Sequence, residues 1–315
     1  MRLVVGTSSC LIDLELDDRL RVTRETVVGR GHHYGIALLP GPGNVLLCKH
    51  NSGMDRYRAQ GDAPLQRVDR RRSDGGVNKV HQIAYADGGV YLADTEHNSL
   101  VFQTTDGRCS KLHLHGHALD VDHINSVFPC ASGVLTMLHN WYDRPSEVVL
   151  VEHGPDGGLR ATAAICLPDR GCHNVFVDGR RLLYNASEAG TVVALDLVDR
   201  EVERTVALGG HTKGLAATAD HLIVGCSPHV KGKQRFTSKG GLVVLDRRSL
   251  AVLTRVELGR TGPVGNVNEV RALDGAEEAH AADTSLPSGF ASFRLPEKRF
   301  GAGFRLAAVA ARRAR

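Results

Sequence analysis

The chain has 315 residues, of which 42% are hydrophobic and 23% are charged, and these values are ordinary for a globular protein. Basic side chains number 39 against 35 acidic ones, and the resulting net charge of +4 is too small to indicate a nucleic-acid partner. No stretch is apolar over the length that crosses a membrane, so we expect no membrane association either.

Cysteine usage and the first residues predict a cytoplasmic protein. The seven cysteines are scattered and none belongs to a CxxC motif, which favours reduced thiols over a disulfide framework. The opening stretch MRLVVGTSSCLIDLELDD has one Arg, and acidic residues interrupt its apolar run. We therefore expect no signal peptide.

The predicted elements are short strands in a repeated order. Residues 3–28 contain three strand-like runs, LVVGTSS, CLIDLEL and RLRVTRETVV. A hairpin pattern then recurs, with copies that begin at Gly31, Val80, Asp122, Cys172 and His211. Two more strand-like runs follow each hairpin, such as TVVALDLV and EVERTVALG. The spacing of about 40 to 50 residues is that of a four-stranded propeller blade.

The two ends of the chain complement each other. NVNEVRALDG at 266–275 repeats only the first strand of the hairpin, and residues 3–28 lack such a strand. Pairing them would complete a sixth blade and cover the exposed sheet edges. We predict an all-β, six-bladed β-propeller over residues 1–275. The alternative, a pair of β-sandwiches, explains neither the periodicity nor the complementary ends.

Residues 276–315 follow the last predicted strand and are expected to form a C-terminal extension outside the ring. The segment is rich in turn-forming residues and ends in the basic stretch RLAAVAARRAR. We expect a surface appendage or a frayed terminus here, although the basic end could form a short helix.

Histidines fall at equivalent places in the hairpins. In a propeller, the first strand of a blade begins and the second strand ends at the same face, and the first strands line the central channel. Histidines at the start of first strands should therefore converge at the channel mouth. These are the predicted metal ligands: His81, His123, His173 and His211, with His33 as a fifth choice.

Residues at the ends of second strands should lie farther from the axis, where they would meet a substrate. These ends carry the predicted substrate-binding residues His50, His139, Asn140 and His229. Two further predicted substrate-binding residues belong to first strands, Lys213 beside the His211 position and Arg271 in the sixth copy. The candidates for proton transfer are Glu188, Asp94, His97 and Glu269. For each acidic residue a salt-bridged or solvated role is an equal alternative, and a single His at a blade mouth can be a hydrogen-bonded turn residue.

Imidazole ligands in this number suit Zn or Fe, with Cu also possible, better than Ca or Mg, which prefer oxygen ligands. A metal would also relieve the cost, about a few kcal/mol each, of burying imidazoles without partners. The basic segment KGKQRF at 231–236 is expected on the same face. It either covers a negatively charged substrate or forms a solvated loop.

The hairpins HQIAYADGGVYLADTEHN and HNVFVDGRRLLYNASEAGTVVALD resemble the repeats of six-bladed propellers of the gluconolactonase, strictosidine-synthase and NHL type. The resemblance covers nearly all of residues 1–275. Enzymes of the gluconolactonase group bind metal mostly through Asp, Glu and Asn, whereas this chain has His at those mouths.

In its histidines the chain is more similar to peptidyl-hydroxyglycine amidating lyase, whose propeller holds zinc through three axial histidines. It is also similar to the carotenoid cleavage oxygenases, which are seven-bladed and hold iron through four histidines. Neither full motif set is present, and the disulfides of the secreted lyase are missing. The resemblance implies a metalloenzyme without naming its reaction.

We therefore predict a metal-dependent enzyme that acts on a small polar molecule at the channel mouth. Zinc lyase or hydrolase chemistry comes first and iron-dependent oxygenation second. One alternative is a non-catalytic propeller that binds a protein or carbohydrate partner. Another is a structural metal without turnover.

Overall fold

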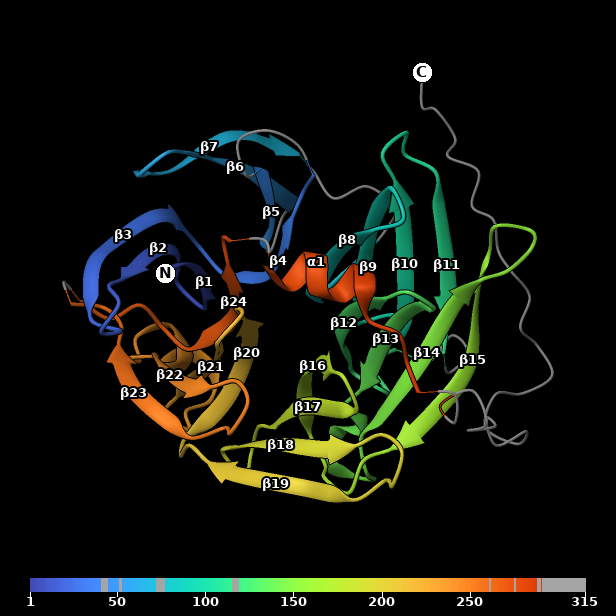
Figure 1. Cartoon of the computed structure of the whole chain (residues 1–315). Coiled ribbons are helices and arrows are strands. Elements are labelled where there is room, and N and C mark those ends of the chain that lie inside the picture. The colour runs from blue at the N-terminus through green and yellow to red at the C-terminus, as the bar shows by residue number, and fades with distance from the viewer. Residues whose placement is uncertain are drawn as a thin grey trace.

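The computed structural model describes residues 1–40, 45–50, 53–71, 77–114, 119–260, 262–274, 276–287 and 290, with the backbone alone at 45–50, 71 and 276–278. In these residues the strands form six antiparallel sheets of four strands each. The sheets are arranged around a common centre, which confirms the predicted β-propeller (Figure 1). None of the helices in the described ranges has the length and apolar character needed to cross a membrane.

Five sheets are each built from consecutive strands. The first holds β4 (His33–Leu38), β5 (Val45–His50), β6 (Gly53–Gln60) and β7 (Ala63–Arg71), and the second holds β8 (Val80–Ala86), β9 (Gly89–Asp94), β10 (Ser99–Thr104) and β11 (Cys109–His113). The third holds β12 (Ile124–Cys130), β13 (Gly133–Leu138), β14 (Glu147–His153) and β15 (Leu159–Cys166), and the fourth holds β16 (Cys172–Asp178), β17 (Arg181–Ala186), β18 (Thr191–Asp196) and β19 (Val202–Ala207). The fifth holds β20 (His211–Ala217), β21 (His221–Ser227), β22 (Gly241–Asp246) and β23 (Val252–Glu257). Two 3₁₀ turns, η1 (Asn140–Tyr142) and η2 (Gly232–Phe236), lie in loops that follow second strands.

The remaining sheet joins the two ends of the chain. Its order is β24 (Val267–Ala272), β1 (Arg2–Thr7), β2 (Cys10–Leu16) and β3 (Val22–Arg30). In the antiparallel pair of β24 and β1, Leu3 lies opposite Ala272 and Val5 lies opposite Val270, and all four side chains are buried. β24 also contacts the inner strands β20 and β4 of the two neighbouring sheets.

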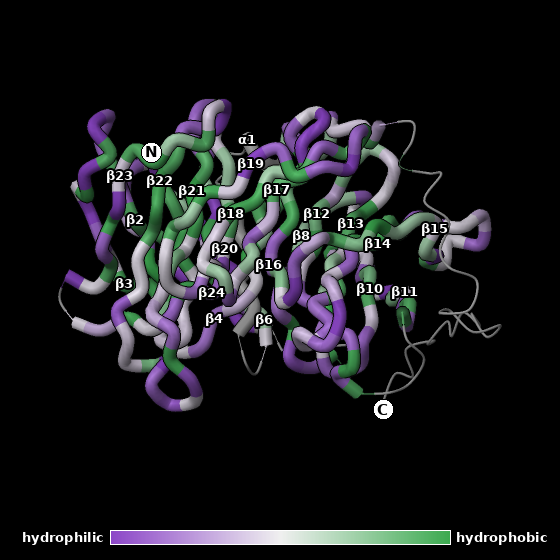
Figure 2. Tube along the Cα trace, turned by 90° about the horizontal axis from the view of Figure 1, so that it is seen from below, coloured by the Kyte–Doolittle hydropathy of each residue, from purple (hydrophilic) through white to green (hydrophobic). Residues whose placement is uncertain are grey.

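The sequence pattern explains which strands lie inside each sheet. Central strands such as TVVALD (β18) and GLVVLD (β22) are hydrophobic almost without interruption, and their four middle residues are buried because neighbouring sheets cover both faces. The outermost strands β19 and β23 are mostly exposed. Hydrophobic segments run along the strands and hydrophilic ones gather at the loops (Figure 2).

Polar side chains join the inner strands of neighbouring sheets. The side-chain oxygen of Gln82 accepts a hydrogen bond from the backbone N–H of Val127 at 2.6 Å. The Asn125 amide donates to the carbonyl of Cys172 at 2.8 Å. Because both amides are buried, each bond satisfies groups that water does not reach.

Glycine allows a closer approach between β4 and β8. A Cβ atom at Gly35 would lie only 2.7 Å from the backbone nitrogen of Ile83. A side chain at this position would push the two inner strands apart, so the centre of the propeller depends on the missing Cβ.

Part of the predicted extension 276–315 packs on the propeller instead of lying free. The helix α1 (Ala276–Asp283) covers the centre of the ring in Figure 1 and lies at its upper face in Figure 2. His280 contacts the Val177 carbonyl at 2.6 Å, and Phe290 is 1% exposed in a cluster with Phe128 and Phe176. The expected surface appendage is therefore wrong for α1 and Phe290, because Ala281 and Phe290 are buried in a cluster with strand residues of the propeller; residues 291–315 lie outside the described residues.

Candidate functional site

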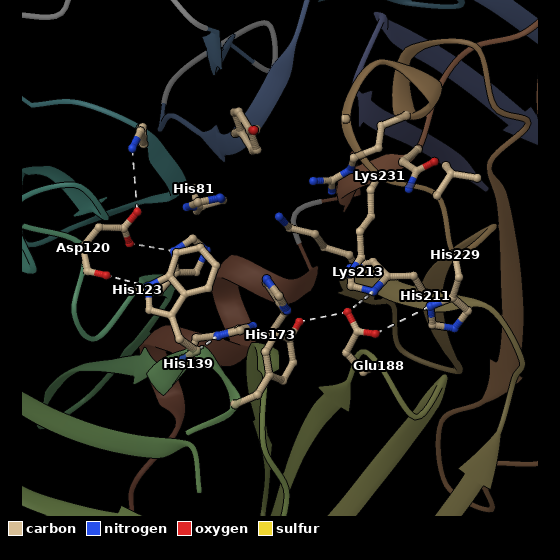
Figure 3. Close-up of a pocket in the computed structure, with 18 of the residues that line it drawn as sticks. His81, Asp120, His123, His139, His173, Glu188, His211, Lys213, His229 and Lys231 are labelled. Atoms are coloured by element: carbon tan, nitrogen blue, oxygen red, sulfur yellow. Dashed lines mark hydrogen bonds and ion pairs between the residues drawn. The ribbon is translucent and has the colours of Figure 1, made fainter. Parts of the chain in front are cut away.

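A cavity of about 860 Å³ opens where the inner strands begin, at the end of the channel opposite α1. Histidines line it together with aromatic, basic and acidic side chains (Figure 3). The lining residues used below are Tyr34, Lys79, His81, Asp120, His123, His139, Trp141, Tyr142, His173, Glu188, His211, Lys213, His229, Lys231 and Arg235.

Six imidazole rings follow one another along the wall of this cavity. They come from four sheets and the loops beside them. The distances between successive ring centroids are 4.7 Å for His81–His123, 5.0 Å for His123–His139, 4.9 Å for His139–His173, 5.9 Å for His173–His211 and 5.9 Å for His211–His229. The spacing is that of rings in edge or tilted contact, so the wall is a continuous imidazole surface.

A register shift at the start of each inner strand aims these side chains. In all six sheets, the pairing of the inner strand with its neighbour is irregular near its first residues, for example between Val80 and Ile83 and between His173 and Val175. Such a bulge places an extra residue on one strand of the pair and changes the direction of the side chains next to it. It explains how histidines at unequal distances from the first buried strand residue reach one cavity.

Hydrogen bonds fix the tautomers of three of the rings. The hydroxyl of Thr95 donates to the carbonyl of Ile124, so it accepts a hydrogen bond from Nδ1–H of His81 at 2.5 Å. The carboxylate of Asp120 likewise accepts from Nδ1 of His123 at 2.8 Å. Both rings therefore keep an unprotonated Nε2.

His139 has the opposite tautomer. Its Nδ1 accepts a hydrogen bond from the backbone N–H of Trp141 at 3.1 Å, which leaves the proton of the neutral ring on Nε2. The wall thus offers acceptor nitrogens at His81 and His123 and a donor at His139.

Four of the rings, those of His81, His139, His173 and His211, are neutral at physiological pH because their pKa values are lowered. Burial lowers the pKa of His139 to about 2 and the pKa of His211 to about 3, and the charge of Lys213 acts in the same direction. Burial also lowers the pKa of His81 and His173 well below the ordinary value. Neutral imidazole is the form that binds a metal or accepts a proton.

Glu188, His211 and His229 form the one trio of described His, Cys, Asp and Glu side chains whose ligand atoms all lie within 4.8 Å of one another. Nδ1 of His211 and Nδ1 of His229 each lie 3.8 Å from a Glu188 carboxylate oxygen. The hydroxyl of Tyr142 donates to the same carboxylate at 2.9 Å. Two imidazoles and one carboxylate are a ligand set that Zn and Fe use in proteins.

Basic side chains also enter the cavity. Burial, followed by the charge of Arg235, lowers the pKa of Lys213 to about 7, and its ammonium group lies 5.3 Å from the centre of the Tyr34 ring. Arg235 and Lys231 come from the η2 loop, which is the predicted basic segment. Lys79 instead lies near two carboxylates, those of Glu96 at 3.4 Å and Asp120 at 3.7 Å.

The predicted metal ligands divide into two groups. His81, His123, His173 and His211 line the cavity, but no three of them meet the 4.8 Å distance among the described side chains. Each of these four rings comes from a different sheet, so the rings are spread along the wall instead of meeting at one point. His33 does not line the cavity, and its Nδ1 contacts the carbonyl of Gly31 at 2.9 Å.

Two predicted proton-transfer residues lie outside the cavity. Asp94 is fully buried and accepts hydrogen bonds from the backbone N–H of Asn78 and from the side chains of His97, Ser99 and Lys111. His97 donates its Nδ1 proton to that carboxylate at 2.8 Å. Both side chains hold the loop after β9 together.

Glu269 and Arg271 are buried on β24 and do not line the cavity. They form an ion pair at 3.1 Å, and Glu269 also accepts from the Gln82 amide at 2.7 Å. Asn140 is buried, and its amide donates to the Pro145 carbonyl at 2.7 Å. The side chain of His50 lies outside the described residues, whereas Glu188, His139, His229 and Lys213 line the cavity as predicted.

Sequence reasoning missed the aromatic part of the wall. Trp141 and Tyr142 follow the predicted pair His139-Asn140 directly, and Trp141 packs on the His123 ring at 4.2 Å. Asn140, Trp141 and Tyr142 all have positive φ values, of 59°, 48° and 69°. This uncommon backbone turns the two aromatic rings back toward the histidines.

No family model matches the chain, and no curated protein matches it. Solved structures share its fold. A protein of unknown function from Bacteroides caccae aligns at a TM-score of 0.61 and 16% identity over 86% of this chain and 97% of its own. The periplasmic gluconolactonase of Pseudomonas aeruginosa aligns at 0.58 and 13% over 86% and 98%. A chain of the nidogen–laminin complex aligns at 0.58 and 11% over 86% and 97%. At these identities the likeness establishes a shared β-propeller fold.

Proposed function

We propose that this protein is a metal-dependent enzyme that acts on a small polar molecule inside the histidine-lined cavity. The observation that carries the proposal is the wall of six imidazoles. Burial lowers the pKa of His81, His139, His173 and His211, which keeps these four rings uncharged at neutral pH. Buried polar groups in this number are costly unless a ligand or ion uses them.

The trio of Glu188, His211 and His229 is our choice for the metal ligands, in place of the predicted axial set. Its donor atoms are already close, and Glu188 and His229 are exposed whereas His211 is partly buried. Three protein ligands leave positions for water or substrate. A bound Zn or Fe ion, or Cu, would polarise a carbonyl group or lower the pKa of a bound water.

The remaining wall residues position the substrate and hold protons. The Nε2–H of His139 can donate a hydrogen bond to a substrate oxygen, and Nε2 of His81 and Nε2 of His123 can accept one. Tyr142 orients the Glu188 carboxylate through its hydroxyl. These groups favour a hydrolase or lyase first, and oxygenation with iron second.

Two coarser findings support this choice. One structural neighbour is a gluconolactonase, which adds support for a hydrolase. The six described cysteines form no disulfide, which supports a cytoplasmic enzyme. We further propose that the six sheets form one closed six-bladed ring, with the β24–β1 pair as its closure.

Metal analysis and an absorption spectrum of the purified protein test the proposal. We expect close to one equivalent of bound transition metal, which His211→Ala and His229→Ala remove. His221→Ala is the matched control, because His221 begins β21, a second strand, at the other end of the sheet.

Less than about a tenth of an equivalent of any transition metal after reconstitution would contradict the proposal. Unchanged metal content in both ligand variants would contradict the choice of trio. A non-catalytic propeller predicts instead that His81→Ala, His173→Ala and His211→Ala together leave partner binding unchanged.

A further inference from the structure

Two basic side chains enter the cavity without an acidic partner among the described residues. Lys213, on β20, is 5% exposed, and the structure gives its ammonium group no hydrogen bond or ion pair with a described residue. Arg235, on η2, lines the same cavity, and its side chain has no ion pair with a described carboxylate. Both positively charged side chains thus belong to the lining of one cavity.

The acidic groups nearby are already engaged. Glu188 faces His211 and His229 and accepts from Tyr142. Asp120 accepts from His123 and lies near Lys79. Glu269 attracts Lys213, but its oxygens are bound by Arg271 and by the Gln82 amide. Lys213 is buried and Arg235 is partly buried, and two like charges placed in this way without a counter-charge are unfavourable, so this part of the cavity is suited to an anion.

The loop that carries Arg235 is anchored to the propeller. The backbone N–H of Asn266 donates to the Arg235 carbonyl at 2.9 Å. The hydroxyl of Ser9 donates to the next carbonyl, that of Phe236, at 2.6 Å. These bonds join η2 to the first and last sheet-forming segments and hold the guanidinium group over the cavity.

We propose that the space between Lys213 and Arg235 binds an anionic oxygen group of the substrate, either a carboxylate or a phosphate. The guanidinium group offers paired donors to such a group, and the ammonium group adds a point charge from the cavity wall. Lys231 lines the rim of the same region, and Figure 3 shows it on the same side of the cavity as Lys213.

This inference rests on the proposed function and gives its substrate a class. His211 and Lys213 lie two residues apart on β20 and both line the cavity. A small acid held at Lys213 would therefore extend past His211 toward the Glu188 trio. The substrate is then a small anion whose reacting bond lies beyond its charged group.

The sole tryptophan of the chain provides the test, because Trp141 lines this cavity. Metal-free protein, prepared with a chelator, is titrated with inorganic phosphate and with benzoate while Trp141 fluorescence is recorded. We expect saturable changes with at least one anion and none with uncharged benzamide. Phosphate alone identifies a phosphate ester, and benzoate alone identifies a carboxylate.

Variants locate the binding. Arg235→Gln and Lys213→Met are each expected to weaken the anion by at least about tenfold, because each removes a charged donor. Lys233→Gln is the matched control, since Lys233 lies in the same turn but outside the cavity lining, and it should stay within about twofold. Circular dichroism checks the fold of Lys213→Met, and Arg235→Gln decides alone if that variant does not fold.

The inference is overturned if no anion changes the fluorescence saturably, or if Lys233→Gln weakens binding as much as Arg235→Gln. Because the titration uses metal-free protein, its failure is separate from failure of the metal proposal. Metal binding without anion binding would leave the enzyme proposal standing and remove only the substrate class.

Discussion

The hydroxyl of Thr95 lies 2.5 Å from Nδ1 of His81 and donates its own proton to the carbonyl of Ile124. One side chain, in the turn between β9 and β10, thus sets the tautomer of a cavity histidine and also binds the first residue of the inner strand β12. This relay of two hydrogen bonds keeps the proton of His81 on Nδ1 and therefore leaves a lone pair on Nε2.

Thr95→Val should break the relay without changing the size of the side chain. It leaves Nδ1 of His81 and the Ile124 carbonyl without their partner, so we expect a loss of about 1–3 kcal/mol in the free energy of unfolding. Urea unfolding measures this loss. Thr205→Val, on the exposed strand β19, should change stability by less than about 0.5 kcal/mol, and equal losses in the two variants would count against the relay.

The stability of the protein should fall in mild acid. Burial lowers the pKa of His81, His139 and His173, whereas in the unfolded chain these rings titrate near the ordinary value of 6.5. Below that pH the unfolded state binds more protons than the folded state, so unfolding is favoured as the pH falls. Each such ring contributes about 1.4 kcal/mol per pH unit until its own folded pKa is reached.

Urea unfolding at pH 7.5, 6 and 5 measures this slope. His139→Gln removes one titrating ring and should reduce the slope below pH 6 by about 1.4 kcal/mol per pH unit. His221→Ala provides the comparison, because His221 is partly exposed outside the cavity. A wild-type stability that does not change between pH 7.5 and 5 would show that the rings are not buried as neutral groups.

Gly35→Ala tests the close approach of the inner strands β4 and β8. The added Cβ would meet the backbone nitrogen of Ile83 at 2.7 Å, and backbone cannot move aside as a side chain can. We expect a loss of about 1–3 kcal/mol, measured by thermal or urea unfolding. Gly154→Ala is the control, because its nearest contact is the end of the Asp156 side chain, and a loss of the same size there would remove the argument from strand packing.

Phe290→Ala tests whether the segment after β24 is part of the folded unit. Phe290 is 1% exposed and belongs to the cluster that contains Phe128 and Phe176. Removing a buried Phe side chain costs about 3–5 kcal/mol. Leu253, on the outer strand β23, is 48% exposed, so Leu253→Ala should lower the free energy of unfolding far less. If Phe290→Ala leaves the free energy of unfolding unchanged, the segment after β24 is an appendage and not part of the folded unit.

The sequence allowed the fold and the position of the cavity to be predicted, because both depend on repetition. Strand pattern and hairpin spacing recur along the chain, and His81, His123, His173 and His211 hold equivalent places in it. The prediction did not extend to which side chains meet at one point. That depends on the bulges at the starts of the inner strands, which change the direction of each ring separately.

Two other features have no sequence signal of their own. Asp94 lies at the end of a second strand as predicted, but its carboxylate already accepts hydrogen bonds from four donors in and beside the same sheet. Trp141 reaches the cavity because three consecutive residues adopt positive φ without being glycine. Local patterns show neither the competition for a carboxylate nor a rare backbone conformation that tertiary packing maintains.

The pairing of β1 with β24 gives the protein a particular order of assembly. Residues 2–7 are synthesised well before their inner partner, residues 267–272. At about 5–20 residues per second, ribosomal synthesis separates the two on the order of tens of seconds. Of the six sheets, the one that contains β1 is begun first and completed last. The apolar edge of β1 must therefore be kept from pairing elsewhere until β24 has been synthesised.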